Sequence, residues 1–189
     1  MDKGTIYTLA LAHLGLPAYK AGTPASAAIE AVAQQCLYLA LDYQTWTFAT
    51  KLHRFTIGDD GQAPLPSDCL RLVRCTLPKY ELLSGTIYAP DANRGTYALT
   101  YVSCEMVENM ALPDNQPAFC EGVSLLIAAK IAPQLTSNPD LSTALEQKAY
   151  TLLSHAKHKD VCSHNSNDQR PSNHQLLEPT ATNHHGLLY

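Results

Sequence analysis

Two histidines three residues apart, His155 and His158, are the pair in this sequence best spaced to share a metal ion. Side chains three apart on a helix lie on one face, and imidazole is a common zinc ligand. A working site needs a third ligand, and nothing supplies one at a recognisable spacing, including His184 and His185. We therefore predict no metal site and no cofactor, and interpret His155 and His158 as favourable positive charge at a helix C-terminus.

The cysteines and one pair of aspartates are the other candidates for chemistry. A cysteine nucleophile at Cys69 or Cys120 would need a nearby histidine, which the sequence does not place. Asp59 and Asp60 stand between glycines, where aspartate is expected in a hairpin turn. The common phosphate, metal and acyl-transfer motifs are absent. We predict no catalytic residue, so that the chain is not an enzyme.

Cysteine spacing also indicates the role of the thiols. The six cysteines form no CxxC motif and are scattered through expected helices and strands. Buried free thiols, made in a reducing cytoplasm, explain this pattern better than disulfides or zinc. They are Cys36, Cys69, Cys75, Cys104, Cys120 and Cys162.

Tyrosines alternate along one expected strand. Tyr97, Leu99 and Tyr101 fall on the same face, which makes the two tyrosines candidate partner-binding residues, since tyrosine is enriched at protein interfaces. The competing interpretation is a half-buried sheet face that packs on the helices.

The spacing of hydrophobic residues along the chain predicts the helices and strands that must position these residues. Asp2 can cap a first short helix, which Gly15 and Pro17 end. Thr23 followed by Pro24 starts a long second helix that should run to about Trp46. From Leu52 the period becomes alternating, and a small antiparallel unit of short strands should extend to about residue 104.

Helical periodicity returns after Pro113. The first helix there is apolar nearly all round, which predicts a buried central helix, and an amphipathic helix should then end near Lys159. Residues 160–189 are rich in Asn, Ser, Thr and His and cannot fold alone, so we expect a flexible arm. Its few apolar residues are candidate partner-binding residues: Leu176, Leu177, Leu187, Leu188 and Tyr189.

Together these patterns predict a mainly α fold with an inserted small antiparallel β unit, of the α+β class. The helical-bundle body is expected at 1–51 and 112–159, the β insertion at 52–111, and the C-terminal arm at 160–189. Trp46 and Phe48 stand at the helix-to-strand junction, where a large ring can fix the angle between body and β unit. A simple core role for Trp46 fits the same position.

Composition excludes some functions. The 189 residues carry a net charge of -4 with a pI near 6.0, which argues against a protein that grips nucleic acid, because such affinity rests on clustered lysine and arginine. The N-terminus lacks a convincing signal-peptide pattern, and no apolar run approaches the roughly 18 residues of a membrane span. We expect a soluble protein without a membrane partner.

The order of these elements and their motifs resembles the head-to-tail adaptor proteins of tailed bacteriophages, especially the tail tubular protein A group of short-tailed phages. The resemblance covers about residues 1–158 and is carried by Leu14-Gly15-Leu16-Pro17, Trp46-Thr47-Phe48-Ala49, Leu65-Pro66-Ser67-Asp68-Cys69-Leu70-Arg71-Leu72, Leu99-Thr100-Tyr101-Val102 and Leu112-Pro113. Each motif alone is weak, and their order makes the match specific.

The resemblance implies a structural virion protein at the head–tail junction, made in the host cytoplasm. It implies a homo-oligomeric ring of about twelve copies between the portal protein and the tail or nozzle protein. Double-stranded DNA would pass through the ring without sequence-specific binding, and the C-terminal segment would reach the portal. The alternatives are a small Cys- or His-dependent enzyme and another minor virion structural protein.

Overall fold

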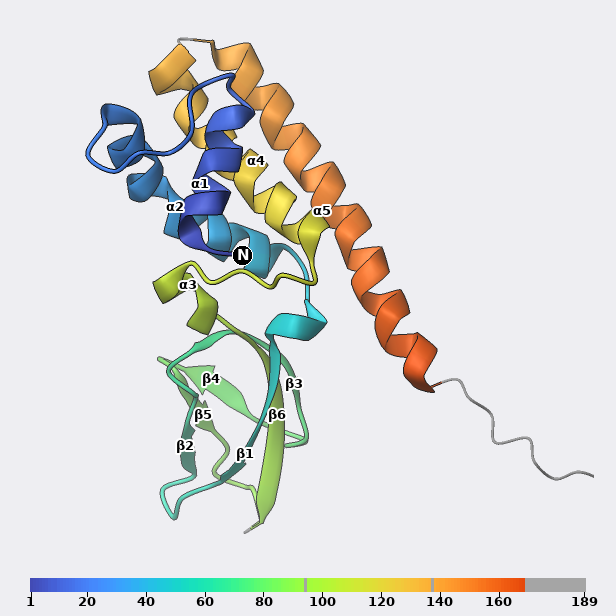
Figure 1. The fold of residues 1–189 in the computed structure, drawn as a ribbon. Coiled ribbons are helices and arrows are strands. Elements are labelled where there is room, and N and C mark those ends of the chain that lie inside the picture. The colour runs from blue at the N-terminus through green and yellow to red at the C-terminus, as the bar shows by residue number, and fades with distance from the viewer. Residues whose placement is uncertain (94, 137, 169–189) are drawn as a thin grey trace, which may run out of the picture.

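The computed structural model describes residues 1–93, 95–136 and 138–168. Helices gather at one end of the molecule and two small antiparallel sheets at the other (Figure 1). This is the predicted α+β fold, a helical body with a β unit inserted into it. The last residues of the expected arm, with its apolar candidates from Leu176 to Tyr189, lie outside the described residues.

Four helices make the body. They are α1 (Lys3–Ala12), α2 (Pro24–Tyr43), α4 (Pro117–Thr136) and α5 (Pro139–Asp168). Asp2 caps α1 by accepting a hydrogen bond from the Thr5 amide, and Thr23 forms a reciprocal capping box with Ser26 at the start of α2. These caps satisfy amides that have no partner inside the helix, which is why the chain turns helical at these two points.

Helix α4 is the centre of the body, because α1, α2 and α5 all pack against it. By length and composition alone α4 could cross a membrane, contrary to the expectation from sequence, but 67% of its most apolar window is buried inside the structure. Gly122 lets α5 approach closely, since a Cβ built there would lie 2.6 Å from Leu153 Cδ2. The apolar surface of α4 is therefore covered by the other helices of the chain.

The β unit contains two three-stranded sheets. In the first, the order is β1 (Thr50–Thr56), β6 (Thr96–Ser103) and β3 (Cys69–Cys75). In the second, the order is β2 (Gln62–Pro64), β5 (Thr86–Tyr88) and β4 (Glu81–Leu83). The sheets share a small core of their own, which consists of Phe55, Ala63, Leu77, Ile87, Ala89, Leu99 and Tyr101.

The strand register assigns the two faces of the first sheet. Lys51 pairs with Tyr101 and Phe55 with Tyr97, so these side chains point toward the second sheet. Leu52 pairs with Thr100 and points the other way. The tyrosine-bearing face is buried at Leu99 and Tyr101 and half-buried at Tyr97, and it packs on the second sheet rather than on the helices.

Three elements differ from the prediction. Helix α5 ends at Asp168 rather than near Lys159, because extending a helix already anchored by packing needs no new nucleation. The expected arm therefore begins as helix. Strand β4 was not predicted; it pairs with β5 through a two-residue hairpin in which Ser84 and Gly85 both have positive φ. The short helix α3 (Glu105–Asn109) was also missed, and it ends at left-handed Met110.

Candidate functional site

The junction between body and β unit begins with a cluster of three aromatic rings. Trp46 is fully buried, and its indole donates a hydrogen bond to the Ala40 carbonyl at 2.8 Å. Its ring centroid lies 4.8 Å from that of Phe119 on α4 and 5.6 Å from that of Phe48. Trp46 thus lies in the helical core, and this core includes Val102 of β6. The ring therefore packs the segment after α2 against α4.

Asp160 of α5 fixes the segment that follows Trp46. Its side chain is 1% exposed and accepts a hydrogen bond from the Thr47 amide at 2.8 Å and another from the Thr47 hydroxyl. Thr47 opens the short 3-10 helix η1 (Thr47–Ala49), which leads into β1. Lys157 donates to the Thr45 carbonyl from the same helix. Sequence reasoning assigned Asp160 to the arm and missed this role.

A second tie joins α2 to β3. The Nε atom of Arg71 lies 3.2 Å from the Asp42 carboxylate, and its Nη2 atom donates to the Thr45 hydroxyl at 3.2 Å. Because Asp42 is exposed, the ion pair itself contributes little to stability. These contacts connect the end of α2 to the edge strand β3.

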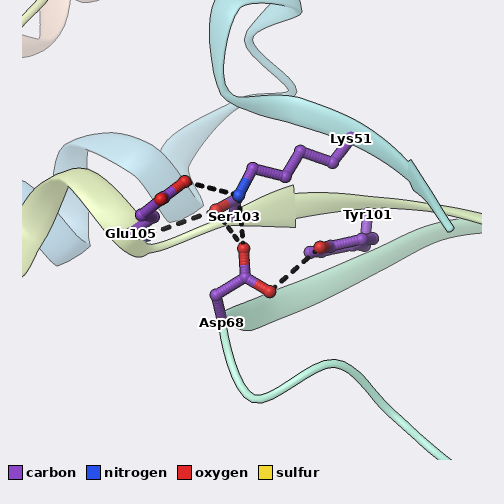
Figure 2. Close-up of polar contacts among 5 residues, drawn as sticks. All are labelled: Lys51, Asp68, Tyr101, Ser103 and Glu105. Carbon is purple, nitrogen blue, oxygen red and sulfur yellow. Dashed lines mark hydrogen bonds and ion pairs between the residues drawn. The ribbon is translucent and has the colours of Figure 1, made fainter.

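A polar cluster lies at the top of the first sheet, within the β unit (Figure 2). Lys51 Nζ of β1 lies 2.7 Å from Asp68 and 2.5 Å from Glu105, at the start of α3. Asp68 also accepts hydrogen bonds from the Tyr101 hydroxyl at 2.9 Å and the Ser103 hydroxyl at 2.7 Å. Asp68 is therefore the centre of the cluster, which links the strands to α3.

The pKa shifts in this cluster favour fixed ion pairs and hydrogen bonds among its residues over proton transfer. Partial burial opposes ionisation of Asp68, but hydrogen bonds from Lys51, Ser103 and Tyr101 outweigh it and lower the pKa to about 2. Hydrogen bonds to Asp68 and Glu105 raise the pKa of Lys51. Burial, followed by the bond to Asp68, raises the pKa of Tyr101 to about 12. General acid–base catalysis favours a pKa near the working pH, so these shifts point away from it.

Two hollows flank the ion pair between Lys51 and Glu105. One, of about 300 Å³, is lined by Phe48, Ala49, Lys51, Ser103, Glu105, Met106, Asn109 and Ala111. The other, of about 460 Å³, we call the acidic hollow; its lining is Tyr38, Lys51, Ser67, Asp68, Cys104, Glu105 and Glu108. Three of its carboxylates face one ammonium group. Nothing in the sequence pattern brings α2, α3 and β1 together here, so this site was not predicted.

The tyrosine candidates have different positions. Tyr101 is 5% exposed and its hydroxyl is bound to Asp68, so it cannot offer the contact surface expected of it. Tyr97 is half-buried, its ring centroid is 6.0 Å from that of Phe55, and its hydroxyl donates to the Asn93 carbonyl. The structure thus brings both residues into the β-unit core and leaves only part of Tyr97 accessible.

The candidates for chemistry lie apart from one another. His155 and His158 are both exposed on α5. Within the described ranges, no three His, Cys, Asp or Glu side chains gather as metal ligands would. Asp60 accepts a hydrogen bond from the Gln62 amide, as a turn residue does, and burial raises the pKa values of the candidate thiols Cys69 and Cys120. A thiol with a raised pKa is a poor nucleophile near neutral pH.

No protein-family model matches the chain, and the search of curated proteins finds no similar one.

Proposed function

We propose that the chain is a head-to-tail adaptor of a tailed bacteriophage. Copies of it form a ring of about twelve between the portal protein and the tail or nozzle protein, and double-stranded DNA passes through the centre. The chain acts as a structural virion protein, with no catalytic role, cofactor or membrane partner. Its place is the head–tail junction of the virion, after synthesis in the host cytoplasm.

The observation that carries this proposal is the junction between body and β unit. A spacer that transmits load between two larger assemblies needs its parts held at a fixed angle. Two polar ties, Asp160 to Thr47 and Arg71 to Asp42, link the body to the β unit, and the aromatic cluster around Trp46 lies in a core that includes Val102 of β6. The elements around the junction also follow the order of the resembled adaptors: two helices, a β unit, a buried helix and a long amphipathic helix.

Charge supports the same function. A conduit that bound phosphates tightly would retard the DNA, and the net charge of -4 opposes such binding. Burial raises the pKa values of the Cys69 and Cys120 thiols, which disfavours the alternative of a Cys-dependent enzyme.

The test uses DNA-filled, portal-bearing heads from the phage that encodes the chain, prepared without this protein. Purified chain added to such heads should co-sediment with them and restore their ability to accept tails. The comparison variant is Trp46→Ala, which removes the buried core of the junction and should attach more weakly; circular dichroism establishes whether it is folded. Heads that sediment without the wild-type chain would contradict the proposal.

A deletion in the C-terminal segment provides a second experiment. Because α5 continues to Asp168, the deletion that spares the described fold removes residues 169–189. Leu176, Leu177, Leu187, Leu188 and Tyr189 are lost with it. We expect an unchanged melting temperature and weaker attachment to heads, since a few apolar residues usually carry most of an interface energy. Unchanged attachment would make the segment unnecessary for docking.

A further inference from the structure

The outer face of the first sheet presents exposed apolar and basic side chains in the described chain. Leu52 of β1 and Arg74 of β3 both pair with Thr100 of β6, so the three side chains form a row across the sheet. Leu52 is 65% exposed, and Val73, in the bulge beside Arg74, is 41% exposed. Leu52 and Val73 lie on the two outer strands of this sheet, with β6 between them, and exposed aliphatic side chains gathered on one face are typical of a contact surface.

Two arginines give this face a positive charge. Arg54 lies two residues beyond Leu52 on the same face of β1, and both Arg54 and Arg74 are exposed. Over the part of the chain that the structure describes, neither arginine takes part in an ion pair, in contrast to Arg71. We define the outer face as Leu52, Arg54, Val73 and Arg74.

The acidic hollow opens on the opposite side of the same sheet. Lys51, which lines it, precedes Leu52 and points to the other face, where it pairs with Tyr101. The hollow combines the exposed carboxylates of Glu105 and Glu108 with the ring of Tyr38, which is 39% exposed. Lys51 balances only part of the negative charge. A guanidinium group fits such a site, because it can pair with carboxylates and stack on an aromatic ring.

We propose that the outer face of one copy docks on the acidic hollow of a second copy of this chain. Arg54 and Arg74 meet Glu105, Glu108 and Tyr38 of the neighbour, and Leu52 and Val73 are covered at the same time. This proposal rests on the ring proposed above and names its interface. Since the two surfaces lie on opposite sides of one sheet, the contact is head-to-tail, and such contacts close into a ring when the rotation permits.

Charge reversal tests the contact. The face variant carries Arg54→Glu with Arg74→Glu, and the hollow variant carries Glu108→Arg, which leaves the Lys51 cluster intact. Sedimentation velocity of the wild-type chain should show concentration-dependent self-association. Each variant alone should associate about tenfold more weakly, because like charges then meet across the interface.

Mixing gives the decisive result. The face variant and the hollow variant complement each other in both directions, so an equimolar mixture should associate more strongly than either variant alone. A chain that carries all three substitutions should also regain association. The matched control reverses exposed charges elsewhere on the β unit, with Lys79→Glu and Glu81→Arg, and should associate like the wild type. Circular dichroism and melting establish that every variant is folded.

Several results would overturn the proposal: a wild-type chain that stays monomeric at millimolar concentration, variants that associate normally, or a mixture that does not regain association. A loss of DNA binding in the face variant with unchanged association would assign the arginines to nucleic acid instead.

Attachment to heads distinguishes a failure of this interface from a failure of the proposed adaptor function. If the charge variants still form rings that bind heads, the interface is wrong and the adaptor function stands. If ring formation depends on these charges but the rings never bind heads, the adaptor function is wrong and the interface stands.

Discussion

The helical body and the β unit differ in how completely they bury their apolar side chains. In the body, Trp46, Phe119 and the middle of α4 have essentially no exposed surface. In the β unit, the small core coexists with exposed Leu52, Val73, Leu82 and Leu83. Short strands in two three-stranded sheets enclose little volume, so a larger share of their side chains remains outside. The body is therefore the better-packed region, although Tyr38, Leu39 and Tyr43 of α2 are exposed as well.

The largest effect that tests this contrast is the loss of Trp46. Trp46→Ala should lower the free energy of unfolding by about 3–5 kcal/mol, because it leaves a cavity among fully buried side chains. Leu52→Ala, in the β unit, should change it by less than about 0.5 kcal/mol, since Leu52 is mostly exposed. Urea unfolding measures both. Equal costs would show that the two regions are packed alike.

A second test adds volume instead of removing it. Gly122→Val places a side chain where Leu153 Cδ2 and Cγ would lie 2.6 and 2.8 Å from its Cβ. Overpacking of this kind typically costs about 1–3 kcal/mol. Gly95→Val in the β unit meets no atom within 4 Å of its Cβ and should be nearly neutral. Thermal melting of the two variants gives the comparison; a neutral Gly122→Val would mean that α5 can shift away from α4.

The next effect is expected at the junction between the body and the β unit. Asp160→Ala removes the acceptor of the Thr47 amide and hydroxyl and should cost about 2 kcal/mol, the range for bonds to a charged group. His158→Ala changes an exposed residue on the same helix and serves as the control. Urea unfolding should separate them clearly. If Asp160→Ala behaved like His158→Ala, α5 would not hold the start of the β unit.

The smallest effect is expected at Asp68 and depends on pH. The folded pKa of about 2 lies below the ordinary value of 3.8, so the ionised cluster stabilises the fold above about pH 4, and this contribution disappears as the pH falls toward 2. Because Lys51 is partly exposed, we expect about 1 kcal/mol. The difference in unfolding free energy between wild type and Asp68→Asn should shrink over that window. A constant difference would exclude this titration.

Local patterns in the sequence were enough to predict the main elements. The period change at Leu52 and its reversal near Pro113 located the β unit between two helical parts, and the all-round apolar character of α4 predicted its burial. These features depend on backbone periodicity and capping, which neighbouring residues determine. Strand β4 was missed because Glu81-Leu82-Leu83 lacks the β-branched and aromatic residues that mark the equally short strand Thr86–Tyr88.

The tertiary structure alone decided the site. Asp68 lies between Lys51, Tyr101 and Ser103 because strands distant in sequence pair in one register, and no local period contains that register. The same register buries Tyr101 and exposes Leu52. Asp160 looked like the start of a polar arm, yet the packing of α5 on α4 carries it to Thr47, where burial is offset by two hydrogen bonds. Residue type fixed what each side chain could bind, and long-range packing fixed which partner it met.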